Sequence, residues 1–239
     1  MGWQGIIFDL NGVLLWDGAL QERAWAEFSA NLRGQPLSPA EMAVHVHGRN
    51  NRHTLEYLLS RPRAKGEPER LSGEKEAIYR RLCLAEAAGF SLSPGAASLL
   101  DWLAANGIPR AIATASGRGN VDFFRKYLGL DRWFRLEAIV YDDGTLRGKP
   151  APDLYCRAAQ VLGLPPAGCV VVEDSLPHFD RQVDVARNRV GCCPGGTRGA
   201  GCPGQTAGCL PCGRITWPLA CQGVVRRIAL GPAQMGRRP

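Results

Sequence analysis

Five side chains suited to phosphate chemistry stand at or just beyond the ends of short apolar segments: Asp9, Thr114, Lys149, Glu173 and Asp174. Carboxylate oxygens are ligands that Mg²⁺ prefers, and a carboxylate can also attack phosphorus as a nucleophile. A lysine and a hydroxyl group can neutralise phosphate oxygens and donate hydrogen bonds to them. Each residue alone also has an ordinary explanation, such as a capping threonine or a solvated acid pair, but the combination predicts metal-assisted phosphoryl transfer.

The segments that carry these residues predict strands of one parallel sheet. Apolar residues run through them without alternation, which is typical of strands buried on both faces. The segments lie at 6–8, 111–114, 138–140 and 169–172. Helical patterns separate the later strands, and this alternation predicts an α/β fold with right-handed crossovers. Because the carboxyl ends of parallel strands meet at one edge of the sheet, the five side chains are expected to converge.

A long segment after the first strand predicts a separate helical unit. Trp25, Phe28 and Leu32 recur at helical spacing, and Ser38-Pro39 is typical of a helix start. No strand pattern occurs between 16 and 89. We therefore expect an all-helical cap at 16–89, inserted into an α/β core that comprises 1–15 and 90–175.

The last quarter of the chain, 176–239, differs in composition from the rest. It holds nine arginines, no lysine and two acids, which accounts for the whole net charge of +7. It also contains six of the nine cysteines: Cys192, Cys193, Cys202, Cys209, Cys212 and Cys221. The segment is rich in glycine and proline and shows no strand pattern, so we expect it to be disordered.

Four motifs, taken in order, resemble those of the haloacid dehalogenase superfamily. They are Asp9-x-Asn11-Gly12-Val13, Thr114-Ala115-Ser116, Gly148-Lys149-Pro150-Ala151-Pro152-Asp153 and Val172-Glu173-Asp174-Ser175. Within that superfamily the sequence is similar to the helical-cap branch that contains β-phosphoglucomutases and phosphoglycolate-type phosphatases. The resemblance implies a Rossmann-like α/β core with an inserted helical cap, and it implies Mg²⁺ as the cofactor.

The resemblance also implies roles for the core residues. Asp9 would form an aspartyl-phosphate intermediate, Thr114 would bind phosphate, and Lys149 would stabilise the nucleophile and the transferring group. The metal ion would be bound, directly or through water, by Asp9, the main-chain carbonyl of Asn11, Glu173 and Asp174.

Substrate contacts are expected from two further segments. Ala115 and Ser116 follow Thr114 in the phosphate-binding motif. The Gly48-Arg49-Asn50-Asn51 loop resembles the substrate-facing part of the cap, although a plain polar turn between helices is the alternative interpretation. The partner expected from these contacts is a small phosphorylated metabolite.

One departure from the superfamily bears on the rate. Asn11 stands where phosphatases and mutases of this kind usually carry a second Asp, and general acid–base catalysis is typically worth ~10²–10⁴ in rate. We therefore predict slow, Mg²⁺-dependent hydrolysis that favours aryl and acyl phosphates, and an altered rate on Asn11→Asp. A β-phosphoglucomutase-like mutase and a phosphate-binding pseudoenzyme remain as alternatives. Dehalogenation is less favoured, because the Glu173-Asp174 pair points to metal-assisted phosphate chemistry.

The unusual tail has two competing explanations. Arginine without lysine, among many glycines, prolines and cysteines, resembles GC-rich coding sequence read in another frame, so we hypothesise a frameshift near codon 177. The alternative is a zinc-binding or nucleic-acid module, since Cys209 and Cys212 have the spacing of a ligand pair.

Composition gives no sign of a membrane or secreted protein. No run of 18 apolar residues occurs, and the first residues lack the basic and apolar regions of a signal peptide. We expect a cytoplasmic monomer without a membrane partner and without a specific nucleic-acid partner.

Overall fold

The computed structural model describes residues 3–47, 49–59, 66–86, 90–149 and 151–174, together with the backbone of 224–227. Four short strands lie parallel in one sheet: β1 (Gly5–Phe8), β2 (Arg110–Ala113), β3 (Ile139–Val140) and β4 (Cys169–Glu173). A fifth strand, β5 (Val224–Arg227), adds antiparallel to β4, which gives the order β3-β2-β1-β4-β5. The expected α/β fold with a parallel sheet is confirmed, although β3 is shorter than expected because Leu136–Ala138 forms a 3₁₀ turn.

The register of the strands brings their carboxyl ends to the same level. Phe8 of β1 lies opposite Ile112 of β2 and Val172 of β4. The Asp9 amide then donates to the Val172 carbonyl at 2.9 Å, so the residues that follow β1 and β4 are neighbours. This pairing is what places Asp9 beside Glu173.

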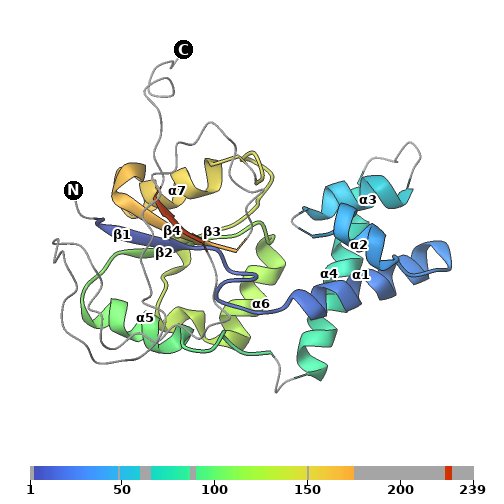
Figure 1. Ribbon diagram of the computed structural model, residues 1–239, viewed down its shortest axis with the longest axis horizontal. Helices are drawn as coiled ribbons and strands as arrows, with labels where there is room; N and C mark the ends of the chain where they lie inside the picture. The colour runs from blue at the N-terminus through green and yellow to red at the C-terminus, as the bar shows by residue number, and fades with distance from the viewer. Residues whose placement is uncertain are drawn as a thin grey trace, which may run out of the picture.

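Helices cover both faces of the sheet, as Figure 1 shows. On one face lies α7 (Asp153–Val161), whose Tyr155 and Ala158 pack with Ile7. On the other face lie α5 (Ala96–Ala105) and α6 (Arg118–Leu128), with Leu100 and Phe124 in a core that also contains Phe8. Strand residues alternate between the two layers because successive side chains point to opposite faces. Short 3₁₀ turns at Leu130–Arg132 and Pro166–Gly168 complete the connections.

The helices described between β1 and α5 form a second unit beside the sheet (Figure 1). They are α1 (Gly18–Arg33), α2 (Pro39–His45), α3 (Asn51–Leu59) and α4 (Glu67–Ala85). A capping box starts α2: Ser38 Oγ accepts from the Glu41 amide, and the Glu41 carboxylate accepts from the Ser38 amide. Their own apolar cluster contains Trp25, Phe28 and Leu55. We call these four helices the cap.

The tail departs from expectation at one place. The sequence shows no strand pattern after 175, yet Val224–Arg227 forms β5, so that expectation is wrong for these four residues. Pairing at the edge of a sheet needs only backbone N–H and C=O groups, and the edge of β4 presents a row of them. The predicted disorder of the rest of the tail, and its six cysteines, lie outside the described residues.

Among the described residues, no helix has both the length and the apolar composition needed to cross a bilayer.

Candidate active site

The Lys149 ammonium group joins two buried carboxylates at the carboxyl edge of the sheet. Lys149 Nζ lies 3.0 Å from Asp9 Oδ1 and 2.6 Å from Glu173 Oε2. The lysine side chain is 4% exposed, while those of Asp9 and Glu173 are 8% and 0% exposed. The three residues come from the ends of β1 and β4 and from the loop after β3. The predicted convergence of these side chains is therefore what the structure shows.

Tyr155 of α7 is a fourth member of this cluster, and it was not expected from the sequence. Its hydroxyl group donates to Glu173 Oε2, the oxygen that also accepts from Lys149. Lys149 Nζ lies 5.0 Å from the centre of the Tyr155 ring, within reach of a cation–π interaction. In the sequence, Tyr155 is one apolar residue on the buried face of a helix, so no local pattern separates it from its neighbours.

Burial and charge shift the pKa values of these groups in opposite directions. Burial raises the pKa of Asp9 to about 7; the Lys149 charge works against this rise, and the Glu173 charge adds to it. Burial alone would lower the pKa of Lys149, but the charges of Asp9 and Glu173 outweigh it and raise that pKa above its ordinary value. Lys149 is therefore held as a cation, and Asp9 is poised to change its protonation near neutral pH.

Three carboxylates form a candidate cation site at the same edge. Ligand oxygens of Asp9, Glu173 and Asp174 lie within 4.8 Å of one another. Burial, followed by the Glu173 charge, raises the pKa of Asp174 to about 6. Three hard oxygen donors in one cluster suit Mg²⁺, and a bound cation would favour their ionised forms. The donor set thus fits the metal ion that the sequence predicts.

Gly12 allows Asp174 to approach the loop after β1. Its φ of +84° favours glycine, and a Cβ at this position would overlap the Asp174 carboxyl group. The close backbone approach explains why the motif needs glycine between the Asn11 and Val13 positions.

The loop after β2 supplies hydroxyl groups. Thr114 is buried, and its amide donates to the Val140 carbonyl at 2.9 Å. The Ser116 amide donates to Thr114 Oγ1 at 3.1 Å, while Ala115 is exposed between them. Ser116 Oγ donates to Asn11 Oδ1 at 2.9 Å, which ties this loop to the loop after β1.

Asn11 also contacts a carboxylate that sequence reasoning overlooked. Its Nδ2 donates to Asp17 Oδ2 at 2.8 Å, and Asp17 is 2% exposed. Asp17 follows the apolar run Leu14-Leu15-Trp16, the same arrangement of an acid after an apolar segment that identified Asp9. That signal was present, but it lies at the boundary of the cap rather than at the end of a strand.

The predicted substrate loop of the cap is placed in part. Gly48 lies outside the described residues, and Arg49 is exposed. Asn51 Nδ2 donates within the cap, to Ser72 Oγ at 2.9 Å and Glu76 Oε1 at 2.6 Å. Within the described part of this loop, Asn50 approaches the core: its Nδ2 lies 3.7 Å from the position that a Cβ on Gly148 would take. The loop therefore reaches the segment that carries Lys149.

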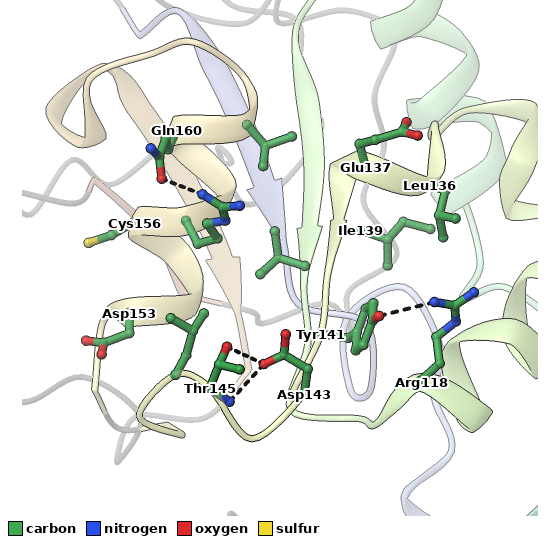
Figure 2. Close-up of a pocket in the computed structure, with 14 residues that line it drawn as sticks. Arg118, Leu136, Glu137, Ile139, Tyr141, Asp143, Thr145, Asp153, Cys156 and Gln160 are labelled. Atoms are coloured by element: carbon green, nitrogen blue, oxygen red, sulfur yellow. Dashed lines mark hydrogen bonds between the residues drawn. The ribbon is translucent and has the colours of Figure 1, made fainter.

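A pocket of about 790 Å³ lies elsewhere, along the free edge of β3. Figure 2 shows Tyr141 accepting a hydrogen bond from Arg118, and Asp143 accepting one from the Thr145 hydroxyl. None of the predicted catalytic, metal or substrate residues lines this pocket. It belongs to the sheet edge and is separate from the carboxylate cluster.

The sequence pattern of the haloacid dehalogenase-like hydrolases matches residues 3–178. The chain belongs to this family. It is 33% identical to hexitol phosphatase A of Escherichia coli (strain K12) over 175 residues, which are 73% of this chain and 76% of that protein. The predicted family, and with it a hydrolase, is thus confirmed.

Solved structures support the assignment of this chain to the family. A HAD hydrolase of family IA, variant 3, from Entamoeba histolytica superposes with a TM-score of 0.68 and 34% identity, covering 73% of this chain and 77% of that one. CbbY from Rhodobacter sphaeroides in complex with phosphate gives a TM-score of 0.62 and 26% identity, covering 73% and 79%. Both structures cover about as large a share of the hydrolase as the match to residues 3–178.

Proposed function

We propose that this hydrolase removes phosphate from a small phosphorylated metabolite, with Mg²⁺ as cofactor and Asp9 as nucleophile. The observation that carries the proposal is the Lys149 ammonium group between Asp9 and Glu173, beside Asp174. The names of the relatives, a hexitol phosphatase and a protein crystallised with phosphate, support the same substrate class.

The residues divide the work as follows. An Asp9 carboxylate oxygen attacks phosphorus, and the bond between phosphorus and the leaving oxygen breaks. Lys149 favours the charged form of Asp9 and neutralises charge on the transferring group, and Thr114 donates a hydrogen bond to that group. Mg²⁺, held by Asp9, Glu173, Asp174 and the Asn11 carbonyl, would supply further positive charge. Water then cleaves the acyl phosphate, which releases inorganic phosphate and restores Asp9.

The amide at position 11 limits this reaction. Asn11 cannot give a proton to the leaving oxygen or take one from water, and such help is typically worth ~10²–10⁴ in rate. Substrates whose leaving groups need no proton, such as aryl and acyl phosphates, should therefore react faster than alkyl phosphates. The phosphorylated form of Asp9 should also live long enough to be detected.

The test is hydrolysis of p-nitrophenyl phosphate and acetyl phosphate with Mg²⁺ and with EDTA, followed by mass spectrometry of the acid-quenched protein. We expect Mg²⁺-dependent phosphate release and an 80 Da adduct on Asp9 (roughly the mass of PO₃H). Asp9→Asn should abolish both, whereas Asp122→Asn, at an exposed acid on α6, should change neither. Hydrolysis that survives Asp9→Asn would refute the proposal. Conversion of a hexose 1-phosphate to its 6-phosphate without phosphate release would instead indicate the mutase.

A further inference from the structure

A buried hydrogen-bond network connects Asn11 to the cap through Asp17. Asp17 Oδ2 accepts from Asn11 Nδ2 at 2.8 Å, from Gln21 Nε2 at 3.0 Å and from the Tyr79 hydroxyl at 2.6 Å. Gln21 belongs to α1 and Tyr79 to α4, while Asn11 lies in the loop after β1. One carboxylate oxygen thus gathers donors from the catalytic loop and from two helices of the cap.

The network fixes which way the Asn11 amide faces. The Asn11 NH₂ group faces Asp17, because the Asp17 oxygen accepts from Asn11 Nδ2. The Asn11 Oδ1 then faces Ser116 Oγ, from which it accepts at 2.9 Å. Ser116 follows the phosphate-binding Thr114, and Asn11 follows Asp9 by two positions. The orientation of this amide therefore decides which Asn11 atom links the loop of the nucleophile to the phosphate loop.

We propose that Asp17 is a positioning residue for this reaction, and that Asn11 and Asp17 form a matched pair of amide and carboxylate. A carboxylate at position 11 is compatible with the site only when position 17 carries the amide. Asp17 acts through Asn11 and through Ser116 rather than by touching substrate. The expected effect on kcat rests on the proposed phosphohydrolase function, whereas the expected effect on stability does not.

The matched pair changes what Asn11→Asp should do. Considered by itself, this substitution supplies the missing acid–base group and should accelerate hydrolysis. Beside Asp17 it places acceptor against acceptor at a buried position, and a buried polar group that loses its partner is costly. The exchanged pair, Asn11→Asp with Asp17→Asn, restores a donor between the two side chains. The amide nitrogen, in the place of Asp17 Oδ2, can donate to the carboxylate at position 11, and the Tyr79 hydroxyl can accept from it. Gln21 Nε2, which donates to the same Asp17 oxygen, loses its acceptor, so the exchange restores the pair but not the whole network.

The test is a double-mutant cycle on the full chain with three variants: Asn11→Asp, Asp17→Asn and the exchanged pair. Melting temperature is measured with EDTA, and kcat and KM for p-nitrophenyl phosphate are measured with saturating Mg²⁺. Asn11→Asp should lower the melting temperature by about 4 °C or more and lower kcat by at least about tenfold. The exchanged pair should melt above Asn11→Asp by about 2 °C or more and should match or exceed the kcat of the unchanged protein. Asp122→Asn is the control for an exposed carboxylate.

The outcomes separate the two proposals. If Asn11→Asp alone is as stable and as fast as the exchanged pair, or if the exchanged pair fails to fold, the matched pair is overturned. If Asn11→Asp fails to fold and the exchanged pair folds, the matched pair is supported. If no variant hydrolyses any phosphate but the melting temperatures show the coupling, the proposed function fails and the structural role of Asp17 stands.

Discussion

Replacing Lys149 by methionine tests the electrostatics of the site most directly. The substitution keeps most of the side-chain length and removes the cation that lies 3.0 Å from Asp9 and 2.6 Å from Glu173. Two buried carboxylates then face each other without a counter-ion. Breaking a buried ion pair by removing one partner typically costs about 3–5 kcal/mol of unfolding free energy. We expect a loss of that size at pH 8 in EDTA.

The loss should depend on pH with a definite sign. The pKa of Asp9 in the folded protein is about 7, above its ordinary value of 3.8. A raised carboxyl pKa gives stability at low pH that is lost as the pH rises through the folded-state value. Without Lys149 that pKa rises further, and each additional unit is worth about 1.4 kcal/mol. The difference in stability between Lys149→Met and the unchanged protein should therefore shrink from pH 8 to pH 5, by up to about 1.4 kcal/mol from Asp9, because only one pH unit separates pH 8 from the pKa of about 7.

The measurement is urea unfolding at pH 5 and pH 8, with and without Mg²⁺. A bound cation stabilises the folded state and can replace part of the missing charge, so Mg²⁺ should stabilise Lys149→Met more than the unchanged protein. Activity at saturating Mg²⁺ should fall about 10²–10³-fold, as when one transition-state donor is lost. Lys126→Met, at an exposed lysine of α6, should stay within about 0.5 kcal/mol of the unchanged protein. A Lys149→Met protein that is equally stable at pH 8 in EDTA would refute the reasoning.

Two further substitutions probe the groups that hold the acids in place. Gly12→Ala should displace the Asp174 carboxyl group and weaken Mg²⁺ binding about 10–100-fold, measured by titration calorimetry. Gly34→Ala, at a φ of +79° with no atom within 4 Å, carries similar backbone strain and should leave Mg²⁺ affinity unchanged; equal effects of the two would argue against the Asp174 contact. Tyr155→Phe removes a donor to Glu173 and should lower the unfolding free energy by about 1.5–3 kcal/mol in urea, the usual worth of a hydrogen bond to a charged group. An unchanged unfolding curve would show that the Tyr155 hydroxyl contributes nothing to holding Glu173.

Much of the core of the site could be predicted from the sequence. Apolar runs that end in Asp9, Thr114 and Glu173 specify strands, and parallel strands carry their final residues to one edge. That rule holds whatever the details of side-chain packing. It is why Lys149 and Glu173 could be expected to meet Asp9, although they follow it by 140 and 164 positions. The tail could not be treated in this way, because its sequence shows no strand pattern and β5 pairs through backbone groups that every residue except proline has.

Only the tertiary structure decided the contacts that helices make with the strands and with the loops that follow them. Tyr155 reaches Glu173 because α7 packs on the sheet face at one particular rotation, and the helical pattern of α7 fixes which face is apolar but not which residue meets a charge. Asp17 meets Asn11 because α1 and α4 lie against the loop after β1. Hydrogen bonds of this kind depend on positions to within a fraction of an ångström, and local sequence patterns set positions only to within a turn of helix. The sequence itself therefore determined which residues lie at the strand ends. The packing of the cap and of α7 determined which side chains hydrogen-bond to them.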